Sequence, residues 1–184
     1  MRILSNVLTN TAYIALGSNL AGDLDCPTSQ VIRAFQSINS ITKTKLVKES
    51  SLYHSAPIGY DASQLNNTPD FINAVVQVST QLSPENLLDA LLQIENQAGR
   101  QRPFANAPRE LDCDLLLYGN IVMDSKKLTL PHPRMHERAF VLLPLAEISP
   151  DLTLANHGNV VKLAQRFNDQ GIKILWFSKN FPIL

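Results

Sequence analysis

The order of the apolar segments is the feature that most constrains how this chain can fold. Short apolar runs typical of buried strands alternate with stretches of helical periodicity, and no segment between them has the biased composition of a linker. The runs predicted as strands cover residues 12–16, 46–54, 72–80 and 111–119. The first of them ends at Gly17-Ser18-Asn19, which predicts a turn. With helices after the first and third runs, the order is β-α-β-β-α-β.

Each of the two helices is predicted from a start signal followed by an apolar stripe. The first begins near Pro27 and Thr28, and the second has Ser83 as N-cap, Pro84 at its first position and Glu85 in its first turn. Apolar residues at helical spacing follow in both: Val31, Ala34, Phe35 and Ile38 in the first, and Leu87, Leu91, Ile94 and Ala98 in the second. Gly99 is expected to end the second helix.

This order of elements predicts an α+β fold with a ferredoxin-like sheet core. Two further apolar periodic segments, residues 138–148 and 159–167, and a strand-like segment at 172–177 follow it. We expect the C-terminal helices to cover the open face of the sheet, giving three α-β-α layers, and the last strand to lie at a sheet edge. Residues 1–184 are expected to form a single domain, with residues 1–10 as a short N-terminal extension.

Composition excludes several classes of protein. A hydrophobic content of 45% supplies a core, and 16 basic against 16 acidic residues argue against a nucleic-acid or membrane-surface binder. Cys26 and Cys113 are far apart and form no metal or disulfide pattern, which favours a reducing cytoplasm. No stretch of about 18 uninterrupted apolar residues predicts a membrane span. We expect a cytoplasmic monomer.

Phosphate binding, if present, would depend on side chains. The chain has seven glycines and neither a GxGxxG nor a GxxxxGK[ST] motif. Basic residues gather in one stretch instead: Arg100, Arg102, Arg109, Arg134 and Arg138, with Lys126, Lys127, His132 and His136. This set suits a polyanion, although a solvated loop with scattered charge is the alternative for any single member.

Two acidic residues in an apolar run form the strongest candidate site. Asp112 and Asp114 lie two residues apart, so in a strand both carboxylates project from one face. Leu111, Cys113 and Leu115 project from the other. Ionised carboxylates held side by side repel each other, and the simplest reason to place them so is to bind cations. Oxygen ligands without a histidine or cysteine cluster favour Mg²⁺, which keeps waters and bridges to phosphates.

The stretch APRELDCDLLLYG, which contains both aspartates, resembles the signature of the 6-hydroxymethyl-7,8-dihydropterin pyrophosphokinase family. Further blocks resemble the family in the same order: AYIALGSN, SSLYHSAPIG, PDFINAVV, IENQAGRQR and LPHPRMHERAFVLLPLAEISP. About 140 residues are covered. One Asp-x-Asp is a weak signal, but ordered blocks with these spacings are specific.

The resemblance implies Mg²⁺-dependent transfer of pyrophosphate from ATP to the hydroxymethyl group of the dihydropterin, giving AMP and the pterin diphosphate for folate synthesis. Two Mg²⁺ ions would be held by Asp112 and Asp114. Arg100 and Arg109 match the catalytic arginines of the family's mobile loop. Many members carry a tryptophan where this chain has Asn106, so loop closure is expected to differ.

The resemblance also assigns residues to the two substrates. The positions that match the family's ATP site are Glu95, Arg102, Lys127, Thr129, His132 and Arg138. Those that match its pterin site are Pro57 and Ile58 as backbone contacts, Phe71 and Phe140 as stacking rings, and Asn73 at the polar edge of the ring.

Each assignment has a plainer alternative. Without the family, Phe71 and Phe140 would be core residues, Glu95 a solvated glutamate near a helix end, and His132 a structural histidine. For the whole chain, the competing functions are a catalytically idle pterin or nucleotide binder and a ferredoxin-like RNA-binding module. The apolar runs at 12–16 and 72–78 lack the aromatic set that RNA binding needs.

Overall fold

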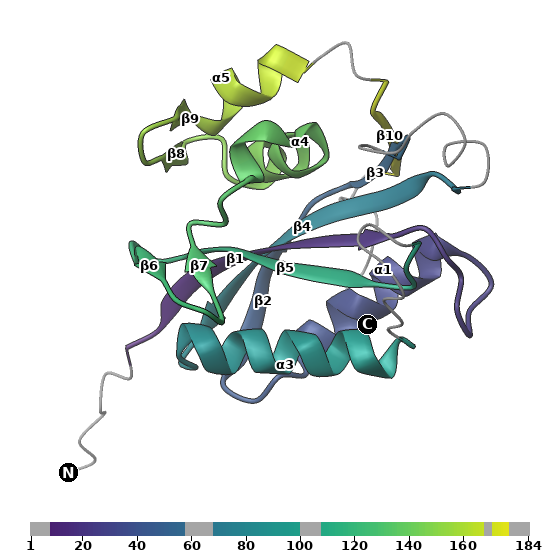
Figure 1. Cartoon of the computed structure of the whole chain (residues 1–184), viewed down its shortest axis with the longest axis horizontal. Coiled ribbons are helices and arrows are strands. Elements are labelled where there is room, and N and C mark those ends of the chain that lie inside the picture. The colour runs from purple at the N-terminus through teal and green to yellow at the C-terminus, as the bar shows by residue number, and fades with distance from the viewer. Residues whose placement is uncertain (1–7, 58–67, 100–107, 168–170, 177–184) are drawn as a thin grey trace.

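The computed structural model describes residues 8–57, 68–99, 108–167 and 171–176. Its main sheet joins six antiparallel strands in the order β10-β3-β4-β1-β5, with β2 also paired to β4. The strands are β1 (Asn10–Ser18), β2 (Thr44–Glu49), β3 (Leu52–Ser55), β4 (Phe71–Thr80), β5 (Asp112–Tyr118) and β10 (Lys173–Trp176). Helices pack on both faces of this sheet (Figure 1), so the expected α+β class is confirmed.

Two helices cover one face of the sheet: α1 (Pro27–Asn39) and α3 (Pro84–Gln97). Both predicted apolar stripes are buried against β1, β4 and β5 in the larger core. The predicted N-cap is also confirmed, because the side chain of Ser83 accepts a hydrogen bond from the Asn86 backbone N–H. Helical periodicity and capping therefore predicted this layer correctly.

The other face is covered by the C-terminal half of the chain (Figure 1). It contains η1 (Met135–Glu137), α4 (Ala139–Ile148), α5 (Val160–Ala164) and η2 (Gln165–Phe167). Two small hairpins accompany them: β6 (Met123–Asp124) with β7 (Thr129–Leu130), and β8 (Thr153–Leu154) with β9 (Gly158–Asn159). A second core lies between α4, α5 and the sheet, and β10 pairs with β3 as the expected additional strand.

The predicted strand over residues 46–54 is wrong in its extent, because the chain forms two strands with a break at Ser50 and Ser51. The Ser50 hydroxyl accepts a hydrogen bond from the Val75 N–H and donates one to the Ser51 carbonyl. Serine side chains compete in this way with the backbone hydrogen bonds of a sheet. The break allows β2 and β3 to follow one after the other along β4.

The turn predicted at Gly17-Ser18-Asn19 begins later than expected, because β1 continues through Ser18. Gly17 pairs with Asn73 on one side and with Asp112 on the other. Neighbouring strands on both sides satisfy the backbone here, so the glycine does not end the strand. As a result, the first residues of β4 and β5 lie on either side of the end of β1.

Two absences accompany this fold. In the described parts of the chain, no helix combines the length and apolarity needed to cross a membrane. Cys26 is half-buried, Cys113 is buried, and the two are not bonded to each other.

Glu147 ties α4 to β3 through its carboxylate. The carboxylate accepts hydrogen bonds from the Ser51 N–H at 3.0 Å, the Ser51 hydroxyl at 2.8 Å and the Tyr53 hydroxyl at 2.9 Å. Ser51 and Tyr53 are buried. Burial, with a further contribution from Glu147, raises the pKa of Tyr53, so its hydroxyl stays protonated and remains a donor.

We therefore expect Glu147→Ala to lower the free energy of unfolding by about 2 kcal/mol, because three buried donors lose their acceptor. Urea denaturation followed by circular dichroism measures the change. Glu137→Ala is the control, since the side chain of Glu137 is 59% exposed and its loss should cost about 0.5 kcal/mol or less. Equal losses in the two variants would contradict the anchoring role of Glu147.

Candidate active site

The acidic pair lies on the sheet face that α4 covers. Asp112 and Asp114 project from one face of β5, while Cys113 and Leu115 pack into the core with α1 and α3 on the other. The side chains of Asp112 and Asp114 are 18% and 36% exposed. The alternation predicted from sequence is therefore present, and the two carboxylates are partly shielded from water.

Three cationic or ionisable groups from separate segments surround this pair. Arg109, just before β5, donates from Nη1 to Asp112 Oδ2 at 2.7 Å. Arg138, at the start of α4, places Nη1 3.5 Å from Asp114 Oδ2. His132, which follows β7, has Nε2 3.9 Å from the same oxygen. The structure thus brings together five of the predicted site residues: Arg109, Asp112, Asp114, His132 and Arg138.

The pKa values of two members are shifted by this environment. Burial, followed by repulsion from Asp112, raises the pKa of Asp114, while His132, Arg138 and Arg109 act against the rise. Burial lowers the pKa of His132, and Asp114 acts against that shift. At neutral pH the imidazole is therefore uncharged, and the two arginines supply the positive charge beside the carboxylates.

Two aromatic rings flank the charged cluster, and each faces a guanidinium group. The Arg109 guanidinium carbon lies 5.8 Å from the centroid of Phe71, and that of Arg138 lies 5.7 Å from the centroid of Phe140. Both rings are half-buried. Neither ring is fully enclosed, but Phe140 packs against the second core, so the plainer alternative holds in part for Phe140.

Asn73 lies on the same face of β4 as Phe71 and is only 4% exposed. Its side-chain nitrogen donates to Ser55 Oγ at 2.9 Å and approaches the Tyr53 carbonyl at 3.5 Å. The amide is thus oriented by β3, which leads directly to the half-buried Pro57. Ile58, Arg100, Arg102 and Asn106 lie outside the described residues.

Glu95 is buried, and the solvated alternative is wrong. The residue is 2% exposed, and its carboxylate accepts a hydrogen bond from the Cys113 N–H at 2.7 Å. Glu95 lies four residues after Leu91, so it belongs to the buried stripe of α3. That spacing is the sequence signal that predicts burial of Glu95. The hydrogen bond of its carboxylate is to the backbone between the two aspartates.

Lys127 and Thr129 make their described contacts away from the acidic pair. Lys127 Nζ forms an ion pair with Asp89 Oδ1 of α3 at 2.6 Å. The Thr129 hydroxyl donates to Asp124 Oδ1 at 2.8 Å across the β6–β7 hairpin. Their predicted contacts with ATP stay predictions.

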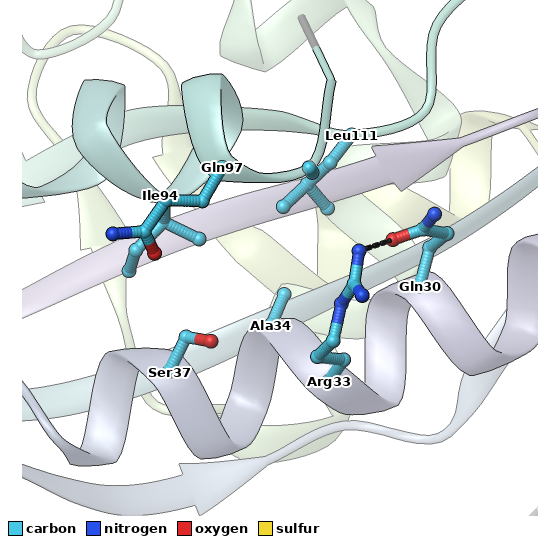
Figure 2. Close-up of a pocket in the computed structure, with 8 residues that line it drawn as sticks. Gln30, Arg33, Ala34, Ser37, Ile94, Gln97 and Leu111 are labelled. Carbon is cyan, nitrogen blue, oxygen red and sulfur yellow. Dashed lines mark hydrogen bonds between the residues drawn. The ribbon is translucent and has the colours of Figure 1, made fainter. Parts of the chain in front are cut away.

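A small cavity of about 160 Å³ lies between α1 and α3 (Figure 2). These helices cover the face of the sheet opposite the acidic pair. Its wall includes Ile94 and Leu111, while Arg33 and Gln30 are hydrogen-bonded to each other at one side. Arg33 is also paired with Asp23 at 2.8 Å, so its charge is already balanced. The cavity is separate from the candidate site.

The donor set of the acidic pair suits Mg²⁺ better than a transition metal. Among the described residues, no group of three or more histidine, cysteine, aspartate or glutamate side chains could hold a metal ion. Two carboxylates alone fit an ion that keeps most of its waters and bridges to substrate phosphates. They do not fit a fully enclosed protein site.

Comparison with known proteins shows the family of this chain. The family model for 7,8-dihydro-6-hydroxymethylpterin-pyrophosphokinase matches residues 13–150. The chain belongs to this family. Among curated members, the 2-amino-4-hydroxy-6-hydroxymethyldihydropteridine pyrophosphokinase of Haemophilus influenzae is 45% identical over 159 residues, which cover 86% of this chain and 94% of that protein. The enzyme of the same name from Pseudomonas aeruginosa is 42% identical over 163 residues, covering 89% and 95%.

Longer relatives of the pyrophosphokinase family contain a region similar to this chain. The folic acid synthesis protein fol1 of Schizosaccharomyces pombe is 34% identical over 164 residues, which cover 89% of this chain and 21% of that protein. Among solved structures, Plasmodium falciparum HPPK-DHPS A437G with STZ-DHP matches with a TM-score of 0.66 at 14% identity. The match covers 91% of this chain and 47% of that one, so this chain spans about half its length. At this identity the likeness shows the fold alone.

The raised pKa of Asp114 predicts how the ligand-free protein responds to pH. A carboxyl whose pKa is higher in the folded than in the unfolded chain destabilises the fold when ionised, and this cost disappears below the unfolded pKa. Asp114→Asn should therefore raise Tm at pH 7, with a smaller gain near pH 3.5. Differential scanning calorimetry at both pH values tests this, with the exposed Asp151→Asn as control. An unchanged or lower Tm for Asp114→Asn at pH 7 would contradict it.

Proposed function

We propose that this chain transfers a pyrophosphoryl group from ATP to the hydroxymethyl group of 6-hydroxymethyl-7,8-dihydropterin in folate synthesis. The pterin hydroxyl oxygen forms a bond to the β-phosphorus, the bond from that phosphorus to the oxygen bridging to the α-phosphorus breaks, AMP leaves and the hydroxyl proton is released. The observation that carries the proposal is the paired carboxylates of Asp112 and Asp114 between arginines and two half-buried rings. Membership of the family and the names of its curated members support it.

Asp112 and Asp114 are the residues proposed to hold two Mg²⁺ ions. When bound, the ions would neutralise phosphate charge and favour ionisation of the attacking hydroxyl. The protein contributes by holding the main chain between the two carboxylates, since Glu95 Oε1 accepts a hydrogen bond from the Cys113 N–H at 2.7 Å. A strong protein base is not required by this arrangement.

The arginines are proposed to act on the polyphosphate. Arg138, beside Asp114, is placed to bind it, and Arg109 is proposed to stabilise charge as the group moves. Arg100 is proposed as the second catalytic arginine. The remaining ATP contacts proposed from the family are Glu95, Arg102, Lys127, Thr129 and His132.

The pterin slot is proposed between the rings of Phe71 and Phe140, with Asn73 reading the polar edge and Pro57 and Ile58 supplying backbone contacts. The two rings support this placement because each is only half-buried and has one face directed at an arginine of the charged cluster. Asn73 is already oriented by Ser55, so little ordering would be needed on binding.

The organisation of the chain is part of the proposal. Residues 1–184 would form one pyrophosphokinase domain, with residues 1–10 as a short extension, working as a cytoplasmic monomer. The order β3-β4-β1-β5, with each neighbour antiparallel, supports a ferredoxin-like core within three α-β-α layers.

The deciding experiment mixes the purified chain with ATP, Mg²⁺ and 6-hydroxymethyl-7,8-dihydropterin and separates the nucleotides. AMP that forms only when pterin is present is the expected result. ADP would identify an ordinary kinase. Pterin binding without any nucleotide product would favour the idle binder.

Single neutral substitutions of the acidic pair should abolish most turnover. Asp112→Asn and Asp114→Asn each remove one charge on which the proposed ions depend, so kcat should fall by at least about 100-fold while the circular dichroism spectrum is retained. Asp151→Asn, an exposed carboxylate elsewhere, serves as the control and should keep full activity. Mg²⁺-dependent turnover near the control value in both site variants would refute the metal assignment.

Arg109 should lower the affinity of the ligand-free protein for divalent cations, because its guanidinium already pairs with Asp112. Arg109→Gln removes that competing charge, and we expect about 3- to 10-fold tighter Mn²⁺ binding in the absence of ATP, together with a lower kcat. Electron paramagnetic resonance of free Mn²⁺ measures the affinity. Arg33→Gln, whose partner is the distant Asp23, is the matched control. Equal or weaker Mn²⁺ binding by Arg109→Gln would contradict this role.

A further inference from the structure

Asn19 is a buried polar residue to which the sequence assigned only a turn. It follows the last residue of β1 and is 2% exposed. Its side chain and backbone are hydrogen-bonded to two segments that lie 50 and 90 residues away in sequence. Each of those segments leads into a strand that carries proposed site residues.

The first segment contains Arg109. Asn19 Oδ1 accepts a hydrogen bond from the Arg109 N–H at 2.8 Å, and the Asn19 N–H donates to the Arg109 carbonyl at 3.1 Å. The N–H of Leu20 donates to the same carbonyl at 3.2 Å. Both polar groups of the Arg109 backbone are therefore fixed, three residues before Asp112.

The second segment contains Pro69. The Asn19 side-chain nitrogen donates to the Pro69 carbonyl at 3.1 Å. Pro69 stands two residues before Phe71, the first residue of β4. The side-chain amide of Asn19 is thus hydrogen-bonded both to the residues that precede β4, the strand of the proposed pterin site, and to the segment that contains Arg109.

We propose that Asn19 is a positioning residue that sets the distance between Arg109 and the pterin slot. The inference rests on the proposed function. An amide is suited to this position because it offers an acceptor and a donor in different directions, so it can hold an N–H of one segment and a carbonyl of the other. Aspartate keeps only the acceptor, and alanine keeps neither.

A purely structural role is the competing explanation, and Asn159 provides a matched control for it. Asn159 Nδ2 donates to the Pro150 carbonyl at 2.8 Å, and its Oδ1 accepts from the Val161 N–H at 3.0 Å. It therefore makes the same kinds of bonds as Asn19. Asn159 lies at the start of α5, on a different part of the fold.

The experiment compares Asn19→Ala, Asn19→Asp and Asn159→Ala in Tm, kcat and KM for pterin, after AMP formation by the unaltered chain has established the reaction. Loss of both side-chain bonds in Asn19→Ala should lower kcat and raise KM for pterin, together reducing kcat/KM by about tenfold or more. Asn19→Asp retains the acceptor for Arg109, so it should recover most of kcat while KM stays raised. Asn159→Ala should lose stability without a change in either constant.

Two results would overturn the proposal: unchanged kcat and KM in Asn19→Ala, or losses of kcat/KM of the same size in Asn159→Ala at a similar Tm.

A second experiment measures hydrogen exchange in the absence of substrates and therefore does not depend on the reaction. Asn19→Ala should speed exchange in both residues 68–73 and residues 108–112, and Asn159→Ala should not. If Asn19→Ala leaves exchange unchanged in either segment, Asn19 does not join them. Failure of the unaltered chain to form AMP would instead overturn the proposed function and leave the exchange test valid.

Discussion

The repulsion between Asp112 and Asp114 is the constraint on which the arrangement of the site depends. Two carboxylates on one face of a strand, partly shielded from water, raise each other's free energy when ionised. The structure balances them with Arg109 from the segment before β5 and Arg138 from the start of α4. Arg109 stands only three residues before Asp112, so this half of the balance is local in sequence. Arg138 reaches Asp114 across 24 residues, which requires β5 and α4 to be in place together. The fold therefore supplies the part of the charge balance that local sequence cannot.

The two faces of the sheet have different tasks. The face packed against α1 and α3 is apolar and contains the larger core, and it includes one buried carboxylate, Glu95, that holds the Cys113 N–H. The opposite face is where charge and aromatic rings gather, and α4 is tied to that face by Glu147. The layer of α1 and α3 thus packs against the apolar side of β5, while the layer of α4 contributes Arg138 beside Asp114 in addition to its own core. Such a division is expected where electrostatic preorganisation has to be maintained at some cost in stability.

Much of the fold followed from periodicity, because the apolar stripes of α1 and α3 and the alternation in β5 each depend on local spacing. The aspartates and their common face were predictable for the same reason. The split of β2 from β3 was not, since it depends on Ser50 finding the backbone of Val75, a contact that spans 25 residues. The burial of Glu95 could be predicted from its position four residues after Leu91. Its hydrogen-bond partner could not be predicted, because the Cys113 N–H lies on another element. The role of Asn19 could not be predicted, because a Gly-Ser-Asn sequence is typical of an ordinary turn. Only its hydrogen bonds to distant segments distinguish Asn19 from a turn residue.

The position of Arg109 links these observations. Its backbone is fixed by Asn19 and its guanidinium spans from Asp112 to the ring of Phe71, although its Nε is buried without a hydrogen-bond partner in the described part of the chain. One side chain thus occupies the neighbourhood of the proposed cation site and covers a face of the proposed pterin slot. An arginine that is incompletely satisfied in this position has less to lose when a phosphate offers new acceptors. The side chain of Arg109 therefore links the proposed cation site to the proposed pterin slot, while Asn19 holds its main chain.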